Sequence, residues 1–129
     1  VCKKIKTKKR AKIFRKSSLK PERLYDTQQM FKKIYPPHSR SLADAGVHLA
    51  EEMGEVSEAI HYYLGDHKEK FFENIRNEIA DYISCFFGVS NSANIPVAKE
   101  LENMFYNNCH VCHKAPCICK FSFIAKFES

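Results

Sequence analysis

Residues 51–81 read EEMGEVSEAIHYYLGDHKEKFFENIRNEIAD. This stretch holds two acidic pairs of equal spacing, Glu52-x-x-Glu55 and Glu78-x-x-Asp81, each within an apolar segment of helical periodicity. Residues three apart in a helix lie on the same face, so each pair presents two carboxylates together. If the two helices pack antiparallel, all four carboxylates meet in one place. The stretch therefore predicts two paired helices with an acidic site between them.

The chemistry of four adjacent carboxylates favours a metal site. Uncompensated anions would repel each other there, and burial would add the cost of desolvating them. A divalent cation removes both problems, and Mg²⁺ is the ion that an all-oxygen ligand set favours. One E-x-x-E pair alone would usually mark a solvated helix face, because Glu is a good helix former. Asp81 favours the site, since Asp is a poorer helix former. We therefore predict Mg²⁺ binding by Glu52, Glu55, Glu78 and Asp81.

The apolar periodicity around this stretch predicts four helices. They run from near Pro21 to Tyr35, from about Leu42 to Leu64, from about Lys70 to Asn91, and from Pro96 to Asn107. Pro36-Pro37 ends the first helix, because proline lacks an amide donor and disfavours helix for its predecessor. Gly65-Asp66 is expected to stop the second, with Gly in the left-handed position after a C-terminus.

The second predicted helix carries an apolar stripe that we expect to face the core. The stripe consists of Val47, Met53, Val56, Ile60 and Tyr63. Glu52 and Glu55 are expected to flank it, while Glu51 and Glu58 lie further toward solvent. Cys85, within the third predicted helix, is expected to be an inert, buried thiol.

The expected fold is an all-α helical bundle with antiparallel helices and a small C-terminal zinc-binding knuckle. A chain of 129 residues is long enough for one real core. We divide it into a basic tail or linker at 1–20, a helical domain at 21–108, and a Cys-rich knuckle with a C-terminal tail at 109–129. The third predicted helix has more aromatic surface than a small monomer covers, which predicts contact with another subunit. An ordinary core helix is the alternative.

The basic charge of the chain is confined to one end. Ten of its 21 Lys and Arg residues fall within positions 1–20, and the remainder carries 11 basic against 15 acidic residues, a net charge of −4. The segment is either a solvated tail or linker, or an arm attracted to phosphates or to a membrane surface. No apolar run is long enough to cross a bilayer and no secretory h-region follows the basic residues, so we expect a cytoplasmic protein without a membrane partner.

A second candidate metal site follows the last predicted helix. Cys109-x-x-Cys112 and Cys117-x-Cys119 place four thiols close together. Zn²⁺ takes four soft ligands in a tetrahedron, and such a closed site is structural. His110 or His113 could replace one thiol. Two disulfides would require an oxidising compartment, and a redox dithiol would normally lie near a βαβ pattern, which this sequence lacks. The short C-x-C spacing departs from the commonest zinc pattern.

Two segments resemble a known family. HLAEEMGEVSEAI (48–60) and NEIADYISCFFGVSN (77–91) are similar to the MazG-type all-α nucleoside triphosphate pyrophosphohydrolases. The signature of that family is E-x-x-E, a spacer, then E-x-x-D. Here 22 residues separate Glu55 from Glu78, which suits two helices and a turn. The resemblance covers about Tyr25 to Asn91, and the cysteine cluster is not part of the signature.

The resemblance implies hydrolysis of a nucleoside triphosphate between its α- and β-phosphates, which gives a monophosphate and pyrophosphate. It implies that the four acids hold Mg²⁺ and that one carboxylate, with Glu55 as the candidate, orients the attacking water or takes its proton. It also implies a homodimer or homotetramer. Four residues are candidate substrate contacts because they lie near the acidic stretch: Arg40, Lys68, Asn74 and Arg76.

The rival hypothesis is a binding module. In it, the basic arm and the zinc knuckle contact nucleic acid or a partner protein, and no nucleotide is hydrolysed. The presence of acids at all four signature positions favours the enzyme, whereas the arm and the cysteines favour the rival. The sequence does not specify which nucleotide would be the substrate.

Overall fold

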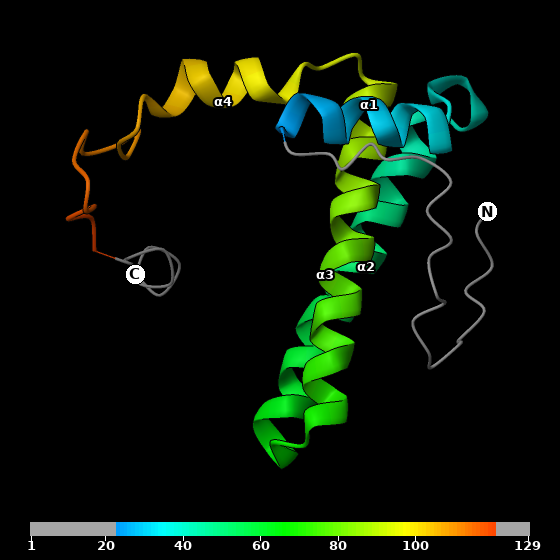
Figure 1. Ribbon diagram of the computed structural model, residues 1–129, viewed down its shortest axis with the longest axis vertical. Helices are drawn as coiled ribbons and strands as arrows, with labels where there is room; N and C mark the ends of the chain where they lie inside the picture. Colours follow the sequence, from blue (N-terminus) through cyan, green and yellow to red (C-terminus); the bar gives the residue numbers. More distant parts are fainter. Residues whose placement is uncertain (1–22, 121–129) are drawn as a thin grey trace, which may run out of the picture.

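The computed structural model describes residues 23–120, and this part of the chain is all helical, without a strand. Its elements are α1 (Leu24–Ile34), the short 3₁₀ helix η1 (Pro37–Ser39), α2 (Leu42–Asp66), α3 (Glu69–Ser92) and α4 (Val97–Phe105). Figure 1 shows α2 and α3 side by side along most of their length, with α1 and α4 lying across one end of this pair. The predicted all-α class is confirmed.

The ends of α2 are set by local hydrogen bonds. At the start, the Asp44 amide donates to the Ser41 hydroxyl oxygen (3.1 Å), and that hydroxyl donates to the Asp44 carboxylate (2.7 Å). At the other end the helix continues through Gly65 and Asp66. It stops at His67, which has a left-handed φ of 54° and whose amide donates to the Tyr63 carbonyl. The prediction that Gly65-Asp66 ends the helix was therefore wrong, because His67 takes the left-handed position.

Small side chains and aromatic pairs bring α2 and α3 together. Ala45 and Ala59 of α2 are buried, and their small side chains allow close approach of the two helices. Near the connection between the helices, Tyr62 stacks on Phe71 with ring centroids 6.0 Å apart. Tyr63 and Phe72 also meet across the two helices, in a tilted arrangement with centroids 5.3 Å apart. Such ring contacts add to the burial of apolar surface.

At the other end of the pair, α3 packs against α1. Phe87 of α3 is only 2 % exposed and stacks on Phe31 of α1, with centroids 5.7 Å apart. Burying an aromatic side chain this completely is among the largest single contributions to a small core. This contact holds α1 across the end of α3.

A buried amide cluster fixes α1 against the junction of α3 and α4. Nε2 of Gln28 donates to Oδ1 of Asn91 (3.0 Å) and to the Ile95 carbonyl (2.8 Å). Oε1 of Gln28 accepts from the Val97 amide at 3.1 Å, and Nδ2 of Asn91 donates to the Gln28 carbonyl at 3.2 Å. Gln28 and Asn91 are therefore buried with their amide groups satisfied, as buried polar groups require.

The buried face of α2 differs from the one predicted. It runs through Ala45, Glu52 and Ala59, at intervals of seven residues, and this face packs against α3. Three residues of the predicted stripe are exposed instead: Val47, Met53 and Ile60. The prediction was wrong for these three residues, because the contact face contains small and charged side chains, which a hydrophobicity pattern does not detect. The other two, Val56 and Tyr63, are half-buried.

The remaining helices agree in part with the predicted burial. Cys85 on α3 and Val97 on α4 are buried, the first as predicted. Leu101, Met104 and Phe105 of α4 are exposed. The predicted basic tail (1–20) and the C-terminal segment FSFIAKF (121–127) lie outside the described residues.

Within residues 23–120, no helix combines the length and the apolar character that crossing a membrane requires.

Candidate functional site

Three of the four predicted acids meet between α2 and α3. One carboxylate oxygen from each of Glu52, Glu55 and Glu78 lies within 4.8 Å of the other two. Glu52 and Glu55 are one turn apart on α2, and Glu78 faces them from α3. Glu52 is only 2 % exposed, and Oε2 of Glu78 is buried as well. A carboxylate this deeply buried is rare, since its desolvation is costly unless charge or hydrogen bonds compensate.

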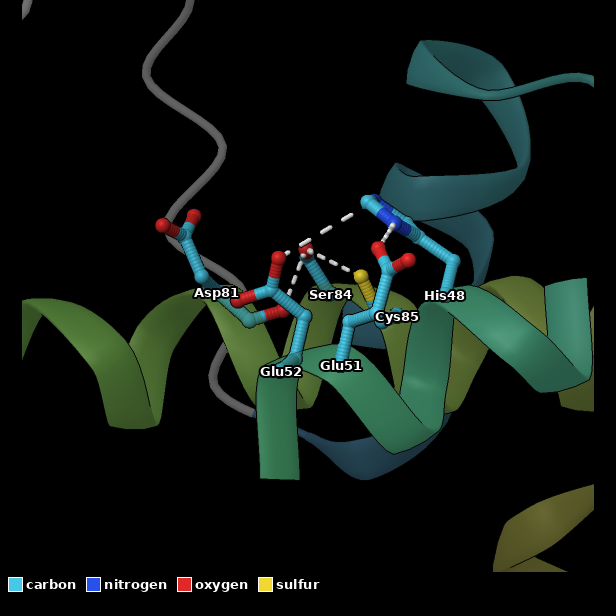
Figure 2. Close-up of polar contacts among 6 residues, drawn as sticks. All are labelled: His48, Glu51, Glu52, Asp81, Ser84 and Cys85. Carbon is cyan, nitrogen blue, oxygen red and sulfur yellow. Dashed lines mark hydrogen bonds and ion pairs between the residues drawn. The ribbon is translucent and has the colours of Figure 1, made fainter. Parts of the chain in front are cut away.

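Asp81, the fourth predicted acid, is exposed and lies outside this three-carboxylate cluster. It lines the same pocket as Glu52, however, and Figure 2 shows both side chains projecting to the same side of the helix pair. Its backbone carbonyl accepts a hydrogen bond of 2.7 Å from the Ser84 hydroxyl. The geometry therefore places Asp81 beside the cluster, at the mouth of the pocket.

The pocket next to the acids is small, about 70 Å³. Its walls come from the end of α1, the start of α2 and the middle of α3, and its lining residues are Tyr35, Arg40, His48, Glu52, Asp81, Ser84 and Cys85. The Arg40 guanidinium lies over the Tyr35 ring, 5.5 Å from its centroid. Stacking of this kind orients the guanidinium. Arg40, a predicted substrate contact, thus lies beside Glu52.

His48 also belongs to the site, although the sequence analysis did not single it out. Its Nδ1 lies 3.4 Å from Oε2 of Glu51, and its Nε2 lies 4.0 Å from Oε1 of Glu52 (Figure 2). The signal was present in the sequence, because His48 precedes Glu52 by four residues and so shares its helix face.

Cys85 is the second residue that the sequence analysis did not place in the site. Its sulfur lies 3.9 Å from the Ser84 hydroxyl, and it lines the pocket with His48 and Glu52. Burial raises the pKa of the Cys85 thiol above its ordinary value. Cys85 follows Asp81 by four residues and Glu78 by seven, so the helical period alone puts it on their face.

The other predicted substrate contacts are not brought into the pocket. Lys68 forms an ion pair with Asp66 (3.3 Å) at the connection of α2 and α3. At 1.5 Å per residue, this is roughly 20 Å along the helix from Glu55. Arg76 pairs with Glu73 (3.3 Å) and lies over the Phe72 ring. Asn74 is exposed, one turn before Glu78.

The four C-terminal cysteines form a compact cluster. Their sulfurs all lie within 4.8 Å of one another, with Cys109 and Cys119 at 3.9 Å and Cys112 and Cys117 at 3.7 Å. The Val111 amide donates to the sulfur of Cys109 (3.4 Å), as amides two residues along do in thiolate turns. A metal can be held here by four sulfurs, so neither His110 nor His113 is needed. The ring of His110 packs edge-on against Phe105, 5.2 Å between centroids.

The thiols of the cysteine cluster differ in pKa. The backbone N–H of Ile118 lowers the pKa of Cys112 to about 6. Amides of Cys112 and Val111 likewise lower the pKa of Cys109. The side chain of Cys117, and then that of Cys112, raise the pKa of Cys119 to about 12. The thiols of Cys112 and Cys109 therefore lose their protons easily. Cys119 loses its proton with difficulty unless a bound cation compensates the charge.

Comparisons of this chain with protein-family profiles, with curated proteins and with solved structures found no match.

Proposed function

We propose that the protein is a Mg²⁺-dependent nucleoside triphosphate pyrophosphohydrolase, which cleaves the α–β phosphoanhydride and releases a nucleoside monophosphate and pyrophosphate. The observation that carries the proposal is the cluster of Glu52, Glu55 and Glu78, whose carboxylate oxygens lie within 4.8 Å of one another. The resemblance of residues 48–60 and 77–91 to the MazG-type family supports the same activity. The antiparallel packing of the two helices that carry the acids is part of this proposal.

The donor set of the cluster fits Mg²⁺. Its three ligand side chains offer only carboxylate oxygens, and hard oxygen donors suit this ion. Asp81, at the pocket mouth, is available as the fourth acid. When bound, the ion supplies charge neutralisation for the phosphates and a lowered pKa for water.

The side chains around the cluster would orient the substrate. Arg40 carries a permanent positive charge beside Glu52, and its stacking on Tyr35 directs the guanidinium to the pocket. We assign it to a phosphate oxygen of the nucleotide. We assign Glu55 to the attacking water, whose proton a carboxylate can accept as the oxygen attacks phosphorus. Lys68, which lies at the far end of the helix pair, has no role in this assignment.

The test is release of pyrophosphate from a panel of nucleoside triphosphates in the presence of Mg²⁺. Glu55→Gln and Glu78→Gln are each expected to reduce turnover at least about 100-fold, because each removes a charged ligand from the ion. Glu58→Gln is the matched control, since Glu58 lies on α2 but is exposed. Full turnover in both ligand variants would refute the carboxylate assignment.

The homo-oligomer expected from the sequence is retained as part of the proposal. Leu42, Met53, Ile60 and Leu64 are all exposed and are spaced at near-multiples of the helical period, so they form one apolar stripe on α2. A second copy of the chain would cover this stripe. Sedimentation equilibrium is expected to show a dimer or tetramer, and Ile60→Glu is expected to shift it toward monomer. A monomeric wild-type chain would exclude this arrangement.

For the cysteine cluster we propose structural Zn²⁺. Four thiols within 4.8 Å of one another match a closed tetrahedral site, which has no open position for catalysis. Elemental analysis of reduced, purified protein is expected to give one Zn²⁺ per chain at this site. Cys109→Ser together with Cys117→Ser should abolish it, and zinc retained at the same amount in that double variant would exclude the cluster as the ligand set.

The binding-module hypothesis is favoured by one observation: the cysteine cluster lies beyond α4, and its Cys117 and Cys119 are exposed. In this alternative the knuckle and the basic arm contact nucleic acid or a partner protein. It predicts salt-dependent affinity for single-stranded DNA or RNA together with no nucleotide turnover. Turnover that depends on Glu55 and Glu78, without such affinity, would reject it.

A further inference from the structure

The pocket contains a second group of metal-binding atoms that differs in chemistry from the carboxylate cluster. A ring nitrogen of His48, a carboxylate oxygen of Glu52 and the sulfur of Cys85 all lie within 4.8 Å of one another. His48 and Glu52 come from α2, and Cys85 comes from α3 (Figure 2). Glu52 therefore belongs to both groups. The first group offers only oxygen ligands, and the second offers nitrogen, oxygen and sulfur.

The mixed donor set selects a different class of ion from Mg²⁺. Mg²⁺ prefers oxygen ligands and rarely accepts a thiolate or an imidazole. Zn²⁺ and Co²⁺ bind imidazole, carboxylate and thiolate together, commonly with three protein ligands and one open position. Three protein ligands converge on the pocket here, and its volume of about 70 Å³ leaves room for an ion and a water.

The distances are close to those that such an ion requires. Zn–N and Zn–O bonds of about 2.0–2.2 Å in a tetrahedron place the two ligand atoms roughly 3.3–3.6 Å apart. Nε2 of His48 and Oε1 of Glu52 are 4.0 Å apart, so small side-chain rotations bring them into range. His48 is partly exposed, at 25 %, so its ring has room to rotate toward Glu52.

A second, independent observation concerns the other nitrogen of the imidazole. Nδ1 of His48 lies 3.4 Å from Oε2 of Glu51, which can accept a hydrogen bond from a protonated Nδ1. With the proton on Nδ1, the lone pair of Nε2 points toward Glu52 and the pocket. A carboxylate–histidine pair of this kind is the usual support of a metal-ligating histidine.

We propose that His48, Glu52 and Cys85 bind a zinc-class divalent ion, at a site distinct from the C-terminal cysteine cluster and supported by Glu51. On binding, the Cys85 thiol releases its proton to solvent and its sulfur forms the bond to the ion. Because Glu52 and Cys85 are both almost completely buried, the ion also compensates their charges in a region of low dielectric constant. The proposal concerns ion binding alone and does not depend on the proposed hydrolase activity.

Co²⁺ titration tests the site directly, because thiolate-to-cobalt charge transfer gives a near-ultraviolet absorption band only when sulfur is a ligand. The full chain is used with five cysteines changed to Ser, so that Cys85 is the remaining thiol: Cys2, Cys109, Cys112, Cys117 and Cys119. Circular dichroism first checks that the helices are retained. We expect the band to grow to one Co²⁺ per chain, and its absence in the folded protein would overturn the proposal.

Single variants in this background assign the ligands. Glu51→Gln removes only a partner of a ligand, so it is expected to weaken Co²⁺ binding by about 10–100-fold. His48→Asn removes a ligand itself and is expected to weaken binding by more than that. His61→Asn, on the exposed face of the same helix, is the matched control and should not change the affinity. Removing the thiol itself, with Cys85→Ser, should abolish the band. If that variant does not fold, His48→Asn still tests the site, because an unchanged band in it would overturn the assignment.

Two carboxylate variants separate this site from the magnesium proposal. Glu52→Gln should weaken Co²⁺ binding, because Glu52 belongs to both groups, whereas Glu55→Gln should leave the cobalt band unchanged. Loss of the band in Glu55→Gln would show that Glu55 is needed to hold the same ion, and would refute a separate mixed site. Absence of pyrophosphate release with the band intact would refute the hydrolase and leave this site standing.

Discussion

Gln28 and Asn91, 63 positions apart in the chain, are joined by two hydrogen bonds in opposite directions. The side chain of Gln28 donates to that of Asn91, and the side chain of Asn91 donates to the backbone of Gln28. The same glutamine accepts from the Val97 amide, so one residue of α1 holds the end of α3 and the start of α4. The position of α1 beside the pocket depends on this contact.

We predict that Gln28→Met destabilises the protein by about 3 kcal/mol or more. The variant keeps the approximate volume of the side chain but leaves the Asn91 side chain, the Ile95 carbonyl and the Val97 amide without their buried partner, at about 1–3 kcal/mol for each such loss. Urea denaturation followed by circular dichroism measures the change. Gln29→Met is the control, because no bond to these groups involves Gln29, and an equal loss in both variants would contradict the argument.

Mg²⁺ should stabilise the wild-type chain through the carboxylate cluster. An ion present at 100 times its Kd stabilises the folded state by about 2.7 kcal/mol, which thermal denaturation detects as a higher Tm. The increase should disappear in Glu55→Gln and remain in Glu58→Gln, since only the first belongs to the cluster. An equal increase in both would show that Mg²⁺ binds elsewhere.

Thiol alkylation should distinguish the cysteines in metal-free, reduced protein. A pKa of about 6 makes the Cys112 thiol about nine-tenths thiolate at pH 7, compared with a few per cent for an ordinary thiol. Because its pKa is lowered, reactivity is lost as the pH falls through 6 and is constant above about 7.5. Mass spectrometry after iodoacetamide treatment should show Cys112 labelled first.

Cys85 and Cys119 should be labelled last in the same experiment, because the pKa of each thiol is raised. Zinc should protect the four C-terminal cysteines, and binding at the proposed site with His48 and Glu52 should slow the labelling of Cys85 further. Rapid labelling of Cys85 in folded protein would contradict its burial in the pocket.

Phe87→Ala should destabilise the protein by about 3–5 kcal/mol, the usual range for deleting a buried aromatic ring. Phe87 is almost fully buried and stacks on Phe31, so the deletion also loosens α1. Phe105→Ala is the matched control, because that ring is exposed on α4, and we expect a change of about 1 kcal/mol or less. Equal shifts of the denaturant midpoint, relative to wild type, in the two variants would contradict this account.

Much of the helical layout could be predicted from the sequence. Prolines and caps give strong local signals, and the predicted bounds of α2, α3 and α4 differ from the observed ones by a few residues. The end of α2 was missed because the left-handed residue is His67 and not Gly65. Glycine is permitted within a helix, so its presence alone does not determine where the helix stops.

The contact face of α2 could not be predicted from hydrophobicity. Burial of Glu52 between Ala45 and Ala59 inverts the usual pattern, and only the packed structure shows that this charged residue faces α3. The acids were nevertheless identified by their spacing, because residues three apart share a helix face in any helix. His48 and Cys85 follow the same rule, and their tertiary meeting depends on the register of α2 against α3, which sequence spacing does not specify.

The placement of α4 affects which parts of the protein can change independently in evolution. α4 leads the chain to residues 109–120, which lie to the side of the α2–α3 pair (Figure 1). Contacts of α4 with the rest of the described chain are made mainly with α1. Loss, exchange or redesign of the terminal knuckle therefore leaves the carboxylates in place, and the two ends of the molecule are free to evolve under separate selection.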